Sequence, residues 1–171
     1  MSAVHYEGVR RCHVEERERI LEVVNAAAVA YRGVIPDDCW HEPYMPASEL
    51  DHEIAAGVAF WGYDLDGSLI GVMGIQPVGE VDLIRHAYVM PGNQRHGVGA
   101  ALLHGLQRLS TKPMLVGTWA AADWAIRFYQ RHGFAPVGDE LTPSLLRRYW
   151  SISDRQIATS TVLANPAWRG R

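Results

Sequence analysis

The chain has 171 residues, 48% of them hydrophobic and 20% charged, which suits one soluble domain with a buried core. A formal net charge of −3 gives no overall attraction to nucleic acid or to an anionic membrane, and two cysteines are too few for a disulfide framework. The N-terminus lacks the apolar core of a signal peptide, and no apolar stretch reaches the roughly 18 to 20 residues of a membrane span. These features predict a single domain over 1–171 in the cytoplasm.

The first third of the chain predicts a short strand and two helices. The strand lies near 8–12, and the first helix runs over 14–32 until Gly33 ends it. The second helix has Pro46 in its first turn and ends at Gly57. The expected buried residues are Ile20, Val24, Ala27 and Tyr31 in the first helix and Ala47, Leu50 and Ile54 in the second. Three prolines make the segment between these helices irregular.

Strands dominate the next part of the sequence. Segments 58–63 and 69–75 predict a hairpin, because Asp66 and Gly67 between them supply the positive φ that a short turn demands. A further strand over 81–90 should alternate between two faces. One face would carry Asp82, Ile84, His86 and Tyr88, and the other Leu83, Arg85, Ala87 and Val89.

A helix over 97–109, a strand over 114–119 and a helix over 123–132 follow. The expected buried stripe of the first of these helices is Val98, Leu102, Leu106 and Leu109. The unit over 81–119 is then strand–helix–strand, so its two strands should be parallel. Three more strands are predicted in the last part of the chain, over 134–137, 145–152 and 157–163.

The most informative stretch is the loop over 94–99, which joins a strand to an amphipathic helix. A helix N-terminus leaves backbone N–H groups without partners and carries about half a positive charge. Gly97 and Gly99 remove side chains where an anion would approach, and Arg95 and His96 add local positive charge. The pattern fits neither a P-loop nor a dinucleotide fingerprint. A plain strand–helix turn is the competing interpretation.

Two motifs in this region resemble those of the GNAT N-acetyltransferase superfamily. Gln94-Arg95-His96-Gly97-Val98-Gly99 matches the signature Q/R-x-x-G-x-G/A, and 125–134 resembles the later helix motif A-x-x-x-Y-x-x-x-G-F. One strand separates the two motifs, as the family requires. Ala122 is a departure, because family members often carry Asn there. The resemblance covers a core over about 8–163 and leaves 164–171 as a C-terminal tail.

The resemblance implies an α/β fold with a mixed, mostly antiparallel central sheet flanked by helices on both faces. It also implies acetyl-CoA as co-substrate, with the thioester between the strands over 81–90 and 114–119. The residues expected to contact the cofactor are Val89, Gln94, Arg95, His96, Gly97, Val98, Gly99 and Ala100. Among the eight histidines no compact ligand spacing occurs, so no metal site is expected.

Catalysis would need a proton donor for the departing thiolate and an acceptor for the amine proton. Tyr129 matches the family's usual general acid, although a core tyrosine would fit the same position. The base is open among His86, Glu42 and His41, and a histidine with its hydrogen bonds satisfied by the fold is an equal interpretation of His86. The expected acceptor-binding residues are Tyr31, Trp40, His41, Glu42, Tyr44 and Arg85, because ring faces and carboxylates suit a cationic amine.

These features favour acetyl transfer from acetyl-CoA to a primary amine of a small molecule. Acetylation of a protein N-terminus or lysine is the alternative enzyme function. A non-catalytic acyl-CoA-binding regulatory module is the alternative from another class. Neither nucleic acid nor a membrane is an expected partner, and the late strands leave open a homodimer.

Overall fold

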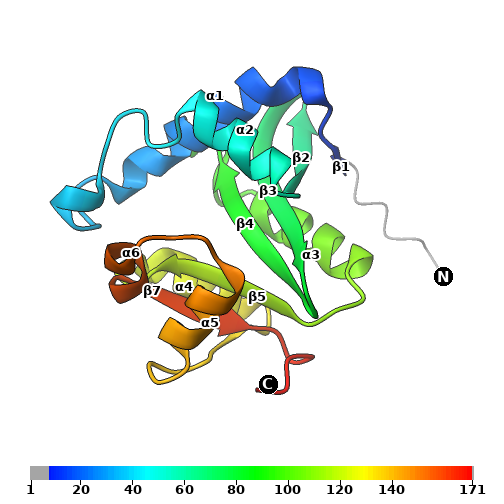
Figure 1. The fold of residues 1–171 in the computed structure, drawn as a ribbon. Coiled ribbons are helices and arrows are strands. Elements are labelled where there is room, and N and C mark those ends of the chain that lie inside the picture. The colour runs from blue at the N-terminus through cyan, green and yellow to red at the C-terminus, as the bar shows by residue number, and fades with distance from the viewer. Residues whose placement is uncertain (1–7, 171) are drawn as a thin grey trace. The chain divides into compact units, whose positions relative to one another are not determined.

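The computed structural model describes residues 8–170, which form two compact units along one hydrogen-bonded sheet (Figure 1). The described part of the first unit comprises 8–29, 42–76 and 85–109, and that of the second 30–41, 77–84 and 110–170. The strand order is β1-β2-β3-β4-β5-β7-β6. The β4–β5 pair is parallel, and the β1–β2, β2–β3, β5–β7 and β6–β7 pairs are antiparallel. The predicted mixed α/β fold is therefore confirmed.

The first unit contains the N-terminal strands, three helices and the second half of β4. Its elements are β1 Val9–Arg11, α1 Arg17–Ala28, α2 Ala47–Ala55, β2 Ala59–Leu65, most of β3 Ser68–Val78, the end of β4 Val81–Val89, and α3 Val98–Leu109. Asp66 and Gly67 form the two-residue turn between β2 and β3 with φ values of 51° and 79°. The predicted hairpin is thus confirmed, together with its turn.

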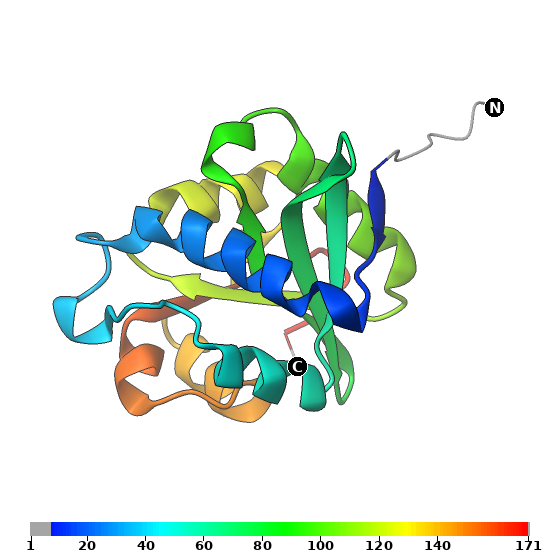
Figure 2. The same cartoon turned by 90° about the horizontal axis from the view of Figure 1, so that it is seen from above.

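Helices cover both faces of the strands in this unit. Residues of α1 and α2, among them Val24 and Leu50, form one cluster with Phe60 of β2 and Val72 of β3. Figure 2 shows α1 crossing over β2 and β3. On the other face, a Cβ atom added to Gly71 of β3 would lie 2.7 Å from Val98 of α3. The absence of a side chain at position 71 therefore lets α3 pack closely against β3.

Several predicted core positions of these helices are wrong. Ala47 is exposed, and Ile54 and Leu109 keep 38% and 52% of their surface in solvent. Tyr31 lies in a 3-10 turn, Val29–Tyr31, rather than on α1. These residues lie at helix ends, where the backbone leaves the layer that covers the sheet. The apolar periodicity therefore predicts burial at positions that face solvent.

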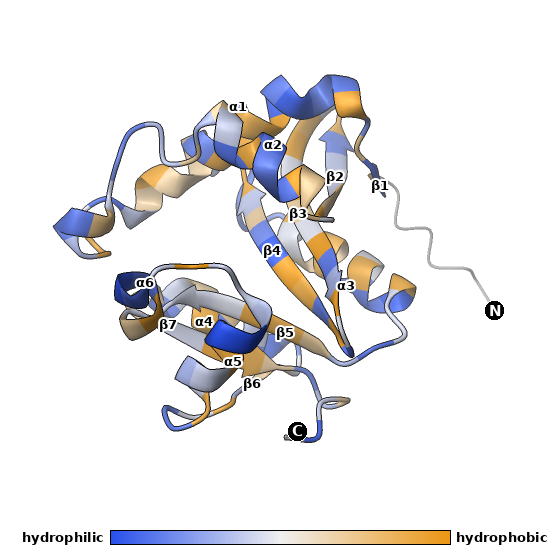
Figure 3. Ribbon diagram, in the orientation of Figure 1, coloured by the Kyte–Doolittle hydropathy of each residue, from blue (hydrophilic) through white to orange (hydrophobic). Residues whose placement is uncertain are grey.

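The predicted alternation of β4 holds only in part. Val81, Asp82, Leu83 and Ile84 are all buried, and His86 has a φ of 55°, which is left-handed backbone in the middle of a strand. This conformation interrupts the regular pleat. Arg85 and His86, predicted on opposite faces, consequently both reach Glu53 of α2, and that prediction is wrong. Figure 3 shows the change along β4 from an apolar start to a hydrophilic stretch.

The second unit contains η3 from the segment between α1 and α2, the start of β4, and the C-terminal elements. These are η3 Asp37–Cys39, β5 Met114–Trp119, α4 Asp123–Arg131, β6 Ala135–Pro136, α5 Thr142–Tyr149, α6 Asp154–Ala158 and β7 Ser160–Ala164. The parallel register of β4 and β5 runs from Asp82–Met114 to Ile84–Val116. The predicted strand–helix–strand unit over 81–119 is confirmed by this parallel pair and by α3 between its strands.

The C-terminal predictions need correction. Segment 145–152 is mostly helix α5, where Pro143 lies in the first turn and the buried Leu145, Leu146 and Tyr149 follow helical spacing. In segment 157–163 only the second half is strand, because the first residues belong to α6. Ser153 caps this helix by accepting a hydrogen bond from the Gln156 N–H at 3.2 Å. Trp168, in the predicted tail, packs against the cluster formed by β4, β5, α5 and β7.

Candidate active site

The loop between β4 and α3 presents unpaired backbone N–H groups. Gln94 to Gly97 are exposed, and Arg95 and Gly97 have φ values of 67° and 79°. Among the described residues, the N–H groups of Arg95, His96 and Gly97 make no hydrogen bond. The side-chain amide of Gln94 donates to the carbonyl oxygen of Val89 at 3.2 Å and so ties the loop to the end of β4.

This loop has the chemistry of an anion site. Its N–H groups come directly before α3, whose first turn contains no acidic residue, while the Arg95 and His96 side chains are exposed beside them. The positive end of the helix dipole and free N–H donors together favour a phosphate or pyrophosphate group. Val98 is buried against the sheet, so only the backbone and the exposed side chains of this loop can face a ligand.

A second polar cluster lies where α2 meets the middle of β4. The Arg85 guanidinium lies 3.0 Å from Glu53 Oε2 and donates a hydrogen bond to Gln76 Oε1 at 2.8 Å. Gln76 in turn donates to the Ala56 carbonyl oxygen at 3.0 Å. Arg85, predicted to bind an acceptor, therefore has two protein partners that hold its side chain on α2 and β3.

His86 completes this cluster without a hydrogen bond. Its Nε2 atom is buried and lies 3.5 Å from Glu53 Oε2, too far for a good hydrogen bond. Its ring stacks on Phe60 with the centroids 6.0 Å apart. Burial alone raises the pKa of Glu53, but His86 and Arg85 outweigh it, so the pKa of Glu53 lies below its ordinary value. An ionised carboxylate thus lies beside an imidazole nitrogen that has no partner among the described residues.

Tyr129 lies on the buried side of α4. Only 4% of its surface is exposed, its ring contacts Phe128 and Phe134 edge-on, and its hydroxyl group makes no hydrogen bond among the described residues. Burial, and secondarily the neighbouring Tyr31, raise the pKa of Tyr129. The hydroxyl group therefore stays protonated at neutral pH and can act as a proton donor.

Apart from Arg85 on β4, the predicted acceptor-binding residues are spread over the segment between α1 and α2. Tyr31 stacks on Trp124 of α4 with centroids 5.7 Å apart, so it lies near the catalytic candidate Tyr129. Trp40 is half-buried, and His41 is exposed. Glu42, another candidate base, is exposed, and Tyr44 is half-buried in the first unit.

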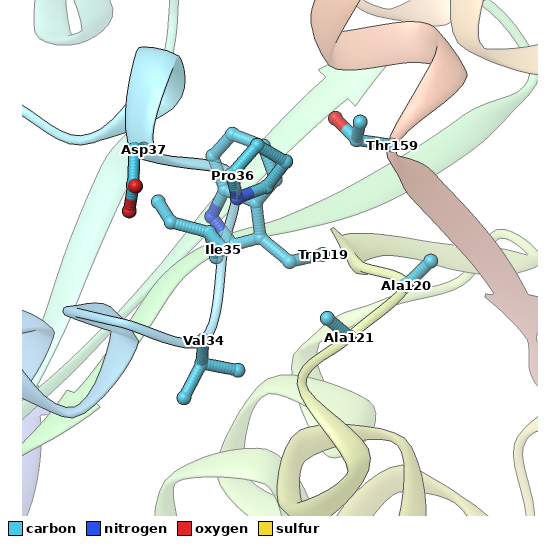
Figure 4. Close-up of a pocket in the computed structure, with 8 residues that line it drawn as sticks. All are labelled: Val34, Ile35, Pro36, Asp37, Trp119, Ala120, Ala121 and Thr159. Carbon is cyan, nitrogen blue, oxygen red and sulfur yellow. The ribbon is translucent and has the colours of Figure 1, made fainter.

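The second unit also contains a cavity of about 450 Å³ (Figure 4). Three segments line it: Val34–Asp37 before η3, Trp119–Ala121 after β5, and Thr159 between α6 and β7. Its size is in the range of sites for small molecules, roughly 300–1,000 Å³.

Two groups of residues near the candidate site were not predicted from the sequence. One is Glu53, because the apolar pattern of α2 predicts Ile54 as the buried residue. Its position three residues after the buried Leu50 would have placed it on the inner face. The residues after β5 carry no chemical signal in the sequence, since Ala120 and Ala121 contribute only shape.

The sequence matches the family model described as "Acetyltransferase (GNAT) domain" over residues 17–144, which is more than half of the chain. The chain belongs to the GNAT acetyltransferase family. This match includes the loop over 94–99 and Tyr129, so both candidate features of this GNAT domain lie within the matched region. No curated protein matches the sequence.

Solved structures of acetyltransferases share the fold of this GNAT domain. PaiA N-acetyltransferase from Thermoplasma acidophilum, in complex with coenzyme A, has a TM-score of 0.69 and 18% identity, with 92% of this chain and 96% of that chain covered. The ribosomal-protein-S18-alanine N-acetyltransferase from Escherichia coli gives 0.67 and 15%, with 94% of each chain covered. N-acetylglutamate synthase from Neisseria gonorrhoeae, complexed with coenzyme A and N-acetyl-glutamate, gives 0.65 and 17%, with 94% of this chain and 35% of that chain covered.

Within 8–170, no group of three or more His, Cys, Asp or Glu side chains is arranged to hold a metal ion. None of the described helices of this GNAT domain has the length and apolar character needed to cross a membrane.

Proposed function

We propose that this GNAT domain transfers the acetyl group of acetyl-CoA to a primary amine of a small molecule. The observation that carries the proposal is the loop before α3, where three consecutive N–H groups have no hydrogen-bond partner among the described residues. Such a row of donors fits the pyrophosphate of coenzyme A. In this assignment the residues over 94–100 hold the pyrophosphate, and the backbone at Val89 pairs with the pantetheine arm.

Acetyl-CoA supplies an activated thioester. In the transfer, a C–N bond forms between the free amine and the acetyl carbon, and the C–S bond breaks. The nitrogen loses a second proton as the amide forms, and this proton is returned to the Tyr129 oxygen through solvent. The hydroxyl group of Tyr129 gives its proton to the departing sulfur, whose thiol has a pKa of about 8.5. A tyrosine buried in this way remains the protonated form that the step requires.

The other proton movement is removal of a proton from the amine. An alkylammonium ion with a pKa near 10 costs roughly 4 kcal/mol to deprotonate at pH 7. We assign this proton to Nε2 of His86, directly or through water, because that atom is buried and has no hydrogen-bond partner. The Glu53 carboxylate, 3.5 Å away, would stabilise the imidazolium ion that forms. Glu42, an alternative base, is exposed.

The structural relatives act on acceptors of more than one kind. One is named for ribosomal protein S18 alanine, and another was solved with N-acetyl-glutamate. A small-molecule acceptor is supported here by the cavity of about 450 Å³, which has the size of a metabolite site.

Calorimetric titration with acetyl-CoA, coenzyme A and ATP tests the proposal. We expect coenzyme A species to bind and ATP at the same concentration to give no comparable signal. Gly99→Val would place a branched side chain at the phosphate-binding turn and should weaken coenzyme A binding at least tenfold. Gly92→Val is the matched control, because no atom lies within 4 Å of a Cβ at position 92. Equal affinity in the two variants would remove the loop from the binding site.

Turnover is then measured as thiol release with a panel of amines and peptides. If only peptides are acetylated, the acceptor is a protein rather than a small molecule. Coenzyme A binding without turnover on any acceptor would favour a regulatory module.

A further inference from the structure

The cavity of the second unit is mainly apolar and contains one charged side chain. Val34, Ile35 and Pro36 line it together with Trp119 and the two alanines that follow (Figure 4). The charge belongs to Asp37, and in Figure 4 Asp37 and Thr159 lie on opposite sides of the labelled group. A ligand that fills this space needs an apolar body and a polar group able to interact with a carboxylate.

The two adjacent acids of η3 have different surroundings. Asp38 accepts two hydrogen bonds from the Arg155 guanidinium, at 2.9 and 3.1 Å, and this contact lowers the pKa of Asp38. Asp37 lines the cavity, and its carboxylate makes no hydrogen bond or ion pair among the described residues. The negative charge of Asp38 is therefore balanced by the protein, whereas that of Asp37 is available to a ligand.

The other polar side chain of the cavity is also an acceptor. The Thr159 hydroxyl group donates its proton to the Arg155 carbonyl oxygen at 2.9 Å or to that of Gln156 at 3.3 Å. Its oxygen is left with lone pairs for a ligand. Both polar side chains of the cavity thus favour a hydrogen-bond donor, and the Asp37 carboxylate favours a donor with positive charge and disfavours an anion.

We infer that this cavity selects a primary amine with a hydrocarbon or aromatic body, whose ammonium group pairs with Asp37. The Ile35, Pro36 and Trp119 side chains contact the apolar body. An α-amino acid with the same body is disfavoured, because its carboxylate would lie close to that of Asp37. The role of this amine as acetyl acceptor rests on the proposed function, whereas its binding can be measured separately.

The experiment compares 2-phenylethylamine with phenylalanine, which differs from it by one carboxylate. Their binding to the full-length wild-type protein in the presence of coenzyme A is measured by calorimetry, alongside Asp37→Asn and Asp38→Asn. We expect wild type to bind 2-phenylethylamine and to discriminate against phenylalanine. Asp37→Asn should weaken binding of the amine about two- to fivefold and reduce the discrimination, as removal of one exposed ion pair implies. Asp38→Asn should leave both affinities unchanged.

Several outcomes would overturn the inference. They are equal affinity of wild type and Asp37→Asn for 2-phenylethylamine, no binding of this amine, or tighter binding of phenylalanine. An equal loss in Asp38→Asn would also overturn it, because a general charge effect would then explain the result. Thermal unfolding of each variant shows that it is folded. A titration with coenzyme A alone tests the proposed function, so the two proposals fail separately.

Discussion

Helices α4 and α5 of the second unit each carry a buried tyrosine, but only one of the two hydroxyl groups has a partner. Tyr149 of α5 donates a hydrogen bond to Glu80 Oε1 at 2.6 Å, and Arg148 pairs with the same carboxylate. Tyr129 of α4, with 4% of its surface exposed against 7% for Tyr149, makes no hydrogen bond among the described residues. Burial raises the pKa of both, and the bond to Glu80 adds to it for Tyr149.

This difference separates a structural tyrosine from a catalytic candidate. Tyr149 uses its hydroxyl group to join α5 to the turn before β4, whereas Tyr129 leaves its hydroxyl group available. A buried polar group without a partner costs roughly 1–3 kcal/mol, so a fold keeps few of them. Among the described residues, Nε2 of His86 in the first unit and Nε1 of Trp168 in the second are such groups.

The largest expected effect comes from Tyr129→Phe. Removal of the proton donor should lower kcat by about 10²–10⁴-fold, while the affinity for coenzyme A and the free energy of unfolding change little. Steady-state kinetics with calorimetry and chemical denaturation measure the three quantities. An unchanged kcat would show that Tyr129, like Tyr149, is a core residue without a catalytic role.

A smaller loss is expected for His86→Gln, which keeps a polar side chain but removes the titrating ring. We expect kcat to fall about 10- to 100-fold and the acid limb of the pH–rate profile to change shape, because a base must be deprotonated to act. Phe60→Leu is the control, since it removes the stacked ring without a titrating group. The same loss in both variants, with an unaltered pH profile, would give His86 a packing role.

Tyr149→Phe should produce the opposite pattern to Tyr129→Phe. Loss of the bond to Glu80 is expected to reduce the free energy of unfolding only slightly, because Glu80 is exposed to solvent, and to leave kcat unchanged. Urea denaturation of Tyr149→Phe, Glu80→Gln and the double variant measures this. Strictly additive effects would show that the two side chains do not interact in solution.

The smallest effect is a pH dependence of stability. The pKa of Glu80 is lowered, first by the hydrogen bond from Tyr149, with Arg148 also contributing. The resulting stabilisation is complete above the ordinary carboxyl pKa of about 4.3 and is lost as the pH falls through the lowered folded-state value. The stability of wild type should therefore decline more steeply below about pH 4.3 than that of Glu80→Gln. If the free energy of unfolding depends on pH in the same way in both proteins, Glu80 does not contribute to the pH dependence of stability.

The parts of the proposed active site that lie close together in the sequence were predictable. The loop over 94–99 and the motif around Tyr129 are short, and each depends on local backbone geometry and spacing. Glu53 could not be paired with His86 in this way, because they lie on α2 and β4 and meet only after both pack. The left-handed backbone at His86 also has no local signal, since a histidine in the middle of an apolar strand predicts regular alternation.

The C-terminal region shows the same limit for the fold. Leu145, Leu146 and Tyr149 were assigned to a strand because short apolar runs fit either structure. Packing of α5 against β4, β5 and β7 decides in favour of helix. Asp37 and Asp38 are equivalent in sequence, and only the position of Arg155, more than a hundred residues away, distinguishes them.

The sequence by itself determined the family, the hairpin, the strand–helix–strand unit and the two motifs of the proposed active site. These follow from local rules, such as a turn that needs positive φ or a helix start that leaves N–H groups free. The tertiary structure decided which polar groups have partners: Tyr149 rather than Tyr129, and Asp38 rather than Asp37. The physical reason is that hydrogen bonding and desolvation depend on atoms brought together from distant parts of the chain, and residue order alone does not specify those distances.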